Sequence, residues 1–265
     1  MTQLTLISHG KTAEVYLYEN NKVLKLFYGW VPEYLIANEY SAAKLAYEKD
    51  ILTPRVYERL SFDGRQGILY DKLENITMDT LLRKQPQKAK HYGRQMAEIQ
   101  YRIHQICAAS ELSDSKKGFA TNLLQKTTLN EPQKQKLLDI LNELPDGKQL
   151  LHGDFHPQNL LFQDKTPWII DWTAATSGHP LADVAGTYLI TKSAYLHHKL
   201  SFLNRFLTKQ VLKTLTNAYL HSYFKLSGFT YKQMKAWLPV KAAIYLEVGL
   251  PKNCESYFHS IIEKG

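Results

Sequence analysis

The sequence has little cysteine and no long apolar run. Its 265 residues include two cysteines, Cys107 and Cys254, and no Cys-x-x-Cys pair. This content argues against a disulfide framework and a cysteine zinc site, and reduced thiols favour a cytoplasmic protein. No apolar stretch reaches the length of a membrane span. Residues 1–11 also lack the basic start and apolar run of a signal peptide, so we expect no membrane association.

Acidic residues are scarce in the second half of the chain. The net charge is +8 at pH 7, and residues 150–265 hold 12 Lys and Arg against 7 Asp and Glu. No run of five like charges occurs, which argues against a disordered basic arm. A solvated surface with a modest excess of lysine accounts for this charge better than a nucleic-acid footprint, so we expect no nucleic-acid partner.

The pattern of apolar residues changes after about residue 70. Before that point, short runs rich in Leu, Tyr and β-branched residues alternate with turn residues such as Asp63-Gly64. These runs predict strands at residues 4–8, 13–18, 22–27, 55–62 and 66–70, and a helix at residues 33–49. Further along, the spacing of apolar residues is mostly helical. The sequence therefore predicts an α+β fold, with an N-terminal antiparallel β-sheet lobe (residues 1–74) and a mainly α-helical C-terminal lobe (residues 75–265).

A P-loop is absent although Gly10-Lys11-Thr12 has the ending of one. The motif needs another glycine five positions earlier, where this chain has Thr5. It also needs a helix directly afterwards, so that backbone amides and the helix dipole face the phosphates. Residues 13–18 have the pattern of a strand instead, which excludes a P-loop.

Three polar residues between residues 149 and 171 form a candidate site. Asp154 is followed by Asn159 and, after two short apolar runs, by Asp171. Phosphoryl transfer needs a carboxylate near the acceptor hydroxyl and oxygen ligands for Mg²⁺ across the phosphates. Asp154 suits the first role, and Asn159 and Asp171 suit the second. Any one of them alone would be an ordinary loop residue, but their order, spacing and apolar flanks favour a site.

The same stretch resembles a known family. His152-Gly-Asp-Phe-His-Pro-Gln-Asn159 resembles the catalytic loop of aminoglycoside phosphotransferases and choline kinases, and Ile170-Asp-Trp172 resembles their metal-binding segment. The resemblance covers about residues 7–189 and implies a bilobal protein kinase-like fold. It also implies ATP and Mg²⁺ as cofactors, and it makes His152 and Asp183 structural supports of the catalytic loop.

In the N-terminal lobe, Val23-Leu24-Lys25-Leu26 is similar to the kinase strand that carries the phosphate-binding lysine. The resemblance implies that Lys25 pairs with Glu39 from the following helix. A lone lysine in a strand and a lone glutamate in a helix are usually solvated. The pair becomes convincing because the three polar residues of the candidate site follow in kinase order.

Two further segments match the nucleotide site of the family. Residues 8–12 take the place of the Gly-rich phosphate loop with a single glycine, which puts Gly10 and Thr12 beside the phosphates; a plain hairpin turn is the alternative. Residues 67–75 resemble the hinge. There, backbone groups of Asp71 and Leu73 would bind the adenine.

We therefore expect an ATP- and Mg²⁺-dependent phosphotransferase, or kinase, acting on a hydroxyl of a small molecule. A sugar-like metabolite or an antibiotic would be the acceptor. Aminoglycosides are polycations, and the few acids of residues 150–265 argue against them. A quaternary ammonium would instead need an aromatic cage, although helical spacing favours a core role for the aromatic candidates. These candidates are Trp172, Trp237, Tyr188, Tyr195, Tyr219, Tyr223 and Tyr245.

Two alternatives stay open. A protein kinase is disfavoured because Gly153 stands where those enzymes have arginine, and because Asp171-Trp172-Thr173 replaces Asp-Phe-Gly. A non-catalytic, nucleotide-binding scaffold of the pseudokinase type is disfavoured because all the catalytic positions are filled. We expect a monomer or a weak dimer.

Overall fold

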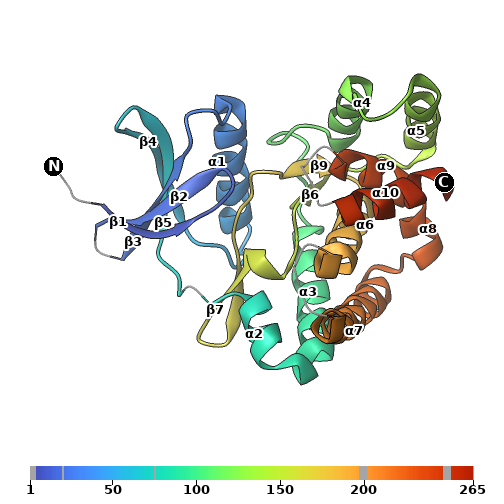
Figure 1. The fold of residues 1–265 in the computed structure, drawn as a ribbon. Coiled ribbons are helices and arrows are strands. Elements are labelled where there is room, and N and C mark those ends of the chain that lie inside the picture. The colour runs from blue at the N-terminus through green and yellow to red at the C-terminus, as the bar shows by residue number, and fades with distance from the viewer. Residues whose placement is uncertain (1–3, 20, 75, 197–201, 247–251, 265) are drawn as a thin grey trace.

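The computed structural model describes residues 4–19, 21–74, 76–196, 202–246 and 252–264. Strands gather in the first third of the chain, and helices make up most of the remainder (Figure 1). In Figure 1 the blue sheet lies on the left and the green to red helices lie on the right. The predicted α+β fold with two lobes is confirmed, while the exact boundary at residues 74 and 75 stays a prediction.

The N-terminal lobe is a five-stranded antiparallel sheet with one helix. In spatial order the strands run β1-β2-β3-β5-β4. The elements are β1 (Thr5–His9), β2 (Ala13–Leu17), β3 (Lys22–Phe27), α1 (Glu33–Glu48), β4 (Val56–Phe62) and β5 (Arg65–Asp71). All six were predicted to within one residue at each end. Because side chains alternate along a strand, Leu24 and Leu26 are buried in the core while Lys25 faces the opposite side of the sheet.

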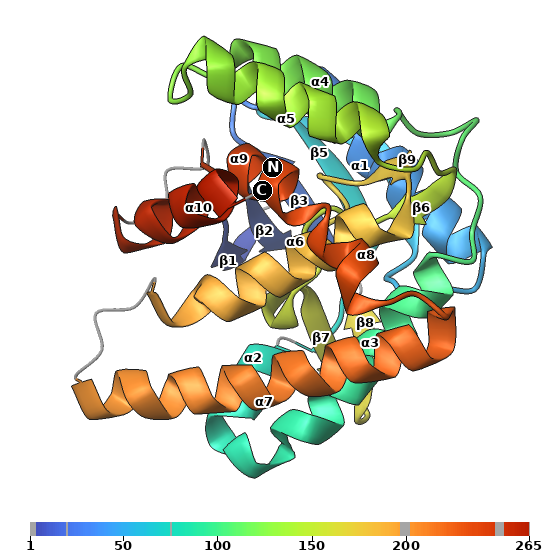
Figure 2. The same cartoon turned by 90° about the vertical axis from the view of Figure 1, so that its right-hand side faces the viewer.

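The C-terminal lobe is built mainly from helices, two of which pack closely along their lengths. The helices are α2 (Met78–Lys84), α3 (Ala89–Ile103), α4 (Ser115–Gln125), α5 (Glu131–Glu143), α6 (Pro180–Ser193), α7 (Phe202–Ser227), α8 (Tyr231–Lys235), α9 (Leu238–Tyr245) and α10 (Lys252–Lys264). The packed pair is α3 and α7. Figure 2 shows α4 and α5 together along the top of the lobe and α7 crossing its lower part. Within the described residues, no helix combines the length and the apolar character needed to cross a membrane.

Four short strands interrupt the helices and carry the candidate site. A hairpin is formed by β7 (Leu160–Gln163) and β8 (Thr166–Ile169), and β6 (Gln149–Leu151) pairs with β9 (Thr176–Gly178). The loop that contains Asp154 and Asn159 runs from β6 to β7, and Asp171 follows β8. Asp154, Asn159 and Asp171 therefore lie in the segments that connect these two small sheets.

Buried hydrogen bonds tie the two lobes together beside this loop. The Trp172 indole donates to the Thr53 hydroxyl at 3.0 Å, and that hydroxyl donates to the Ile169 carbonyl at 2.9 Å. The backbone N–H of Ile169 in turn donates to the Leu52 carbonyl at 2.8 Å. Because these groups are shielded from water, the bonds hold the segment after α1 firmly against the β8 strand.

Candidate active site

A cavity of about 1120 Å³ collects residues from both lobes. The predicted site residues that line it are Gly10, Thr12, Lys25, Glu39, Asp71, Leu73, Asp154, Asn159, Asp171 and Asp183. His152 is fully buried behind the cavity wall. The fold therefore brings together residues that lie up to 173 positions apart, from Gly10 to Asp183.

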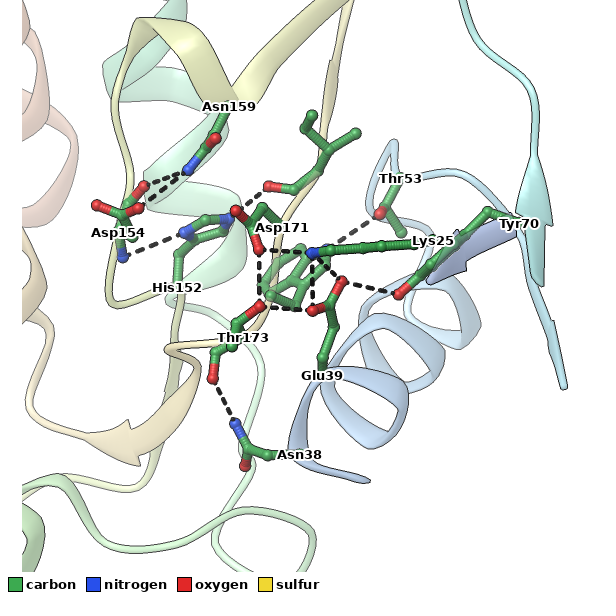
Figure 3. A network of polar contacts seen from close by, with 12 residues as sticks. Lys25, Asn38, Glu39, Thr53, Tyr70, His152, Asp154, Asn159, Asp171 and Thr173 are labelled. Atoms are coloured by element: carbon green, nitrogen blue, oxygen red, sulfur yellow. Dashed lines mark hydrogen bonds and ion pairs between the residues drawn. The ribbon is translucent and has the colours of Figure 1, made fainter. Parts of the chain in front are cut away.

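Lys25 lies at the centre of the charged network in Figure 3. Its Nζ atom is 2.7 Å from Glu39 Oε1 and 2.8 Å from Asp171 Oδ1. Burial disfavours the charge on Lys25, but the Asp171 and Glu39 carboxylates outweigh it and raise the pKa of the lysine. The same pairing holds the pKa of Asp171 well below its ordinary value, in spite of burial. Lys25 and Asp171 are therefore both charged at neutral pH.

Thr173 is a member of this network that we did not predict. Its hydroxyl lies between the Glu39 and Asp171 carboxylates and contacts both. The Tyr70 hydroxyl also donates to Glu39 Oε1, at 3.1 Å. Glu39 is 1% exposed, so these donors supply hydrogen bonds that water cannot. No local sequence pattern marks Thr173, because a hydroxyl in a loop is ordinary in itself.

His152 anchors the loop that contains Asp154 through both of its ring nitrogens. The backbone N–H of Asp154 donates to His152 Nδ1 at 3.3 Å, so the proton of a neutral ring must be on Nε2. That nitrogen lies 3.1 Å from the Ile170 carbonyl oxygen, to which it donates. Burial lowers the pKa of His152, although nearby carboxylates oppose this effect, and the neutral form fits both hydrogen bonds. His152 thus links the loop at Asp154 to the residue preceding Asp171.

The side chain of Asp183, at the start of α6, binds backbone N–H groups of the same loop. Its two carboxylate oxygens accept the N–H groups of His152 and Gly153, each at 2.9 Å. Gln100 and His104 of the α3 region donate to Asp183 as well, at 3.0 and 3.2 Å. Burial disfavours the Asp183 carboxylate, yet the His104 hydrogen bond and the other partners hold its pKa well below the ordinary value. Asp183 thus joins α6 and α3 to the backbone of the loop, and both Asp183 and His104 are buried.

Asp154 carries the one carboxylate in the loop between β6 and β7, and this carboxylate is accessible. Its side chain is 43% exposed, and Oδ2 is 3.4 Å from His156 Nε2. The protein around Asp154 partly desolvates the carboxylate, which raises its pKa. The His156 contact outweighs this effect, so the pKa of Asp154 is lowered and the group is ionised. Figure 3 shows Asp154 beside Asn159 and separated from Lys25 by Asp171.

Asn159 and Asp171 have oxygen atoms that fit a magnesium ion. The Asn159 amide nitrogen donates to the Asp154 carbonyl at 2.9 Å, which orients Oδ1 as the free acceptor. Asp171 uses Oδ1 for Lys25 and Thr173, so Oδ2 is the oxygen left for a cation. Among the described residues, no group of three or more His, Cys, Asp and Glu side chains forms a metal site by itself. Mg²⁺ commonly takes one or two protein oxygens and completes its shell with phosphates and water, so the pair is sufficient.

One end of the cavity is lined by residues of β1, β2 and the loop between them. The loop between these strands is closed by a 2.8 Å hydrogen bond from the Gly10 N–H to the Ala13 carbonyl. At the hinge, the Asp71 N–H is already bound to the Arg55 carbonyl at 3.0 Å. An adenine contact with Asp71 would therefore use its carbonyl oxygen, whereas Leu73 lies on the cavity wall beyond the strand.

The aromatic residues considered for a cage are mostly core residues. Trp237, Tyr219 and Tyr223 are at most 1% exposed and do not line the cavity. Trp172 and Tyr245 do line it, but the Trp172 indole is bonded to Thr53. The side chain of Tyr195 lies outside the described residues. The predicted core role is confirmed for the buried tyrosines and Trp237.

The antiparallel sheet lobe and the helical lobe together form the kinase-like fold of the aminoglycoside phosphotransferases. A family model described as the phosphotransferase enzyme family matches residues 3–237. The chain belongs to this phosphotransferase family, as the sequence motifs predicted.

Solved structures with the same fold include several enzymes of this type. An aminoglycoside phosphotransferase, APH(4)-Ia, in complex with ADP and hygromycin B is 14% identical, with a TM-score of 0.66 over 100% of this chain and 94% of that one. An amicoumacin kinase with AMP-PNP and Ca²⁺ is 12% identical, with a TM-score of 0.61 over 99% and 87%. A choline/ethanolamine kinase family protein from Mesorhizobium loti is 14% identical, with a TM-score of 0.58 over 99% and 85%. At such low identity the likeness concerns the fold.

Among curated proteins, a short region matches acyl-CoA dehydrogenase family member 11. The human protein is 39% identical over 61 residues, which are 20% of this chain and 8% of the relative. The chicken protein is 40% identical over 52 residues, 17% of this chain and 7% of the relative. The match thus spans less than a tenth of these relatives.

Proposed function

We propose that the chain is a kinase that transfers the γ-phosphoryl group of ATP to a hydroxyl of a small molecule. One observation carries the proposal. The Lys25 ammonium is held between Glu39 and Asp171 in a cavity that also contains Asp154 and Asn159. Kinase-type phosphoryl transfer depends on such a lysine–glutamate pair together with a metal-binding aspartate and asparagine.

In the proposed reaction, each charged residue has a separate task. The acceptor oxygen forms a bond to the γ-phosphorus, and the bond from that phosphorus to the β–γ bridging oxygen breaks. The acceptor proton passes to the Asp154 carboxylate, and ADP leaves with the bridging oxygen. Lys25 contacts the phosphates of the nucleotide, and Glu39 holds Lys25 in place. The low pKa of Asp154 suits a residue that orients the hydroxyl while ionised and accepts its proton late.

Asp171 Oδ2 and Asn159 Oδ1 would hold Mg²⁺, which supplies charge neutralisation on the phosphates when bound. The rigid setting of both residues favours this role. Asn159 is anchored to the Asp154 backbone, and Asp171 has a backbone φ of 68°, an unusual value for a residue other than glycine. A strained backbone next to a cavity is typical of functional positions.

The spacing after Asp171 favours a small acceptor over a protein. Helix α6 begins at Pro180, and eight residues separate it from Asp171. Protein kinases use a long segment in this place for binding a peptide, so its absence between these two described residues argues for a compact acceptor. The filled positions also argue against a pseudokinase. Lys25 is paired with Glu39 and Asp171, and the Asp154 and Asp171 carboxylates are ionised.

The proposal is tested by ADP release from Mg-ATP across a panel of hydroxylated compounds. The panel contains aminoglycosides, macrolides, choline, ethanolamine, sugars, sugar acids, sugar phosphates and nucleosides. We expect acceptor-dependent ADP release with at least one class, and a new phosphomonoester resonance in the ³¹P NMR spectrum of the product. Nucleotide binding without any acceptor-dependent release would favour the scaffold alternative.

A further inference from the structure

Lys241 is a buried lysine on the wall of the cavity. It lies in α9, in the otherwise apolar run Leu238-Pro-Val-Lys-Ala-Ala-Ile-Tyr245, and it is 4% exposed. Its side chain lines the same cavity as Asp154. Because an ammonium group loses its hydration when it is buried, such a lysine normally has a carboxylate or several carbonyl oxygens as partners.

Lys241 has none of these partners among the residues that the structure describes. No ion pair or side-chain hydrogen bond joins its Nζ atom to another described residue. Two aromatic rings lie near it instead: the Phe119 centroid is 4.7 Å from Nζ and the Tyr245 centroid is 5.1 Å away. Cation–π contacts recover only part of the lost hydration. The positive charge is thus available for an anion that enters the cavity.

The position of Lys241 relative to the catalytic loop follows from its neighbours. The Tyr245 hydroxyl, one turn further along α9, lies 3.5 Å from the Gly153 carbonyl oxygen. Gly153 directly precedes Asp154. A molecule that places a hydroxyl at Asp154 can therefore extend along α9 toward Lys241.

Helix α6 leaves space for this lysine. A Cβ atom on Gly186 would be 3.1 Å from Lys241 Cε and 2.6 Å from the Tyr245 hydroxyl oxygen. Both distances are shorter than ordinary van der Waals contacts, so a larger residue at position 186 would displace the lysine or the tyrosine. The chain thus leaves room for a charged side chain in a place where an apolar side chain would avoid the cost of burying a charge.

We propose that Lys241 is the anion-binding residue of the acceptor site, and that the acceptor carries a carboxylate or a phosphate group in addition to its hydroxyl. The inference rests on the proposed kinase function and names the substrate class for it. Phe119, Ile244 and Phe258 line the cavity around Lys241 and would contact the carbon skeleton of the acceptor.

The same geometry disfavours cationic acceptors. The rings of Phe119 and Tyr245, which could hold a quaternary ammonium, already contact the Lys241 ammonium. Burial lowers the pKa of Lys241, and the Asp183 and Asp154 carboxylates oppose this shift. Both carboxylates have other partners, since Asp183 binds the loop backbone and Asp154 is close to His156. The Lys241 ammonium would therefore repel a cationic group of an acceptor at this place.

The test measures anion binding in the presence of saturating Mg²⁺ and AMP-PNP, so that the nucleotide site is filled. Sulfate and acetate are titrated calorimetrically into the wild-type protein, Lys241→Met and Lys235→Met. Lys235 lies on α8, is exposed and gives the same change of net charge, so it is the matched control. We expect the wild type and Lys235→Met to bind at least one of the anions, and Lys241→Met to bind it about tenfold more weakly or not at all.

Comparing sulfate with acetate shows which anionic group the acceptor carries. A preference for sulfate indicates a phosphate ester, and a preference for acetate indicates a carboxylate. Equal binding by Lys241→Met and Lys235→Met, or no saturable binding of either anion by the wild type, would overturn the proposal. Lysine-dependent anion binding in a protein that never transfers phosphate would leave the anion site standing and refute only the kinase function.

Thermal unfolding distinguishes an acceptor-binding lysine from a structural one. Lys241→Met roughly keeps the volume of the side chain and removes a buried charge that has no ion-pair or hydrogen-bond partner among the described residues. We therefore expect an unchanged or higher melting temperature. A marked loss of stability would instead mean that the cation–π contacts hold α9 in place, and would overturn the binding role. Once an acceptor is identified, Lys241→Met should raise its KM about tenfold or more and change kcat less.

Discussion

A Cβ atom on Gly153 would lie 2.0 Å from the carbonyl oxygen of Ala174. Gly153 also has a backbone φ of 82°, in the region where side chains are disfavoured. The residue before Asp154 is thus in direct contact with the segment that follows Asp171. This contact couples the proposed base to the proposed metal ligand, and it explains why no arginine can occupy the position in this backbone.

Gly153→Ala should therefore be destabilising and nearly inactive. Gly228→Ala is the control, because Gly228 has a similar φ of 75° with no atom within 4 Å of its Cβ position. We expect a loss of about 1 kcal/mol for Gly228→Ala from backbone conformation alone. For Gly153→Ala, the clash should add about 1–3 kcal/mol. Urea denaturation of both variants measures the difference, and equal losses would show that the close approach to Ala174 is relieved without cost.

Lys25→Met should weaken both stability and nucleotide binding. The substitution leaves the buried Glu39 carboxylate without its cation, which should cost about 3 kcal/mol of unfolding free energy. The double variant Lys25→Met/Glu39→Met also removes the buried Glu39 carboxylate, although Asp171 still lacks its cation. It should therefore recover part of that stability without recovering activity. Denaturation and AMP-PNP titration of the two variants check this. Normal nucleotide affinity in either variant would contradict the role proposed for Lys25.

The N-terminal lobe could be predicted closely because its signals are local. Strands there are short, alternate regularly and end at turns such as Asp63-Gly64, whose φ values are 50° and 73°. The signal at the start of α5 is local as well, since Asn130 and Gln133 form a reciprocal capping box within four residues. Motifs of the catalytic loop likewise lie within a few residues of one another.

Other parts of the site depend on tertiary contacts and gave weaker signals. Thr173 contacts Glu39 from 134 positions away, and Thr53 bonds to Trp172 from 119 positions away. No local pattern marks such partners, because a hydroxyl in a loop is ordinary in itself. Lys241 was the exception that could have been noticed, since a lysine inside a wholly apolar helical run is unusual.

Acid should destabilise the protein partly through Asp183. Its pKa is lower in the folded than in the unfolded state, so its contribution is fully present above the unfolded pKa of about 4 and is lost as the pH falls toward the folded value. Asp183→Asn should be less stable by about 2 kcal/mol at pH 7, because it loses charge-assisted bonds to the loop. Its unfolding free energy should also fall less between pH 5 and pH 2 than that of the wild type. Parallel pH profiles would contradict this assignment.

The central claim concerns Asp154, whose carboxylate lies in the cavity but does not contact Lys25 or its partners directly (Figure 3). The most direct measurement compares the wild type with Asp154→Asn in two assays on the same preparations: AMP-PNP affinity and phosphoryl transfer to the best acceptor of the panel. We predict an AMP-PNP Kd within about twofold of the wild type and a transfer rate lowered by about 100-fold or more, since a general base is worth that much. Full transfer by Asp154→Asn, with nucleotide affinity intact, would contradict the account.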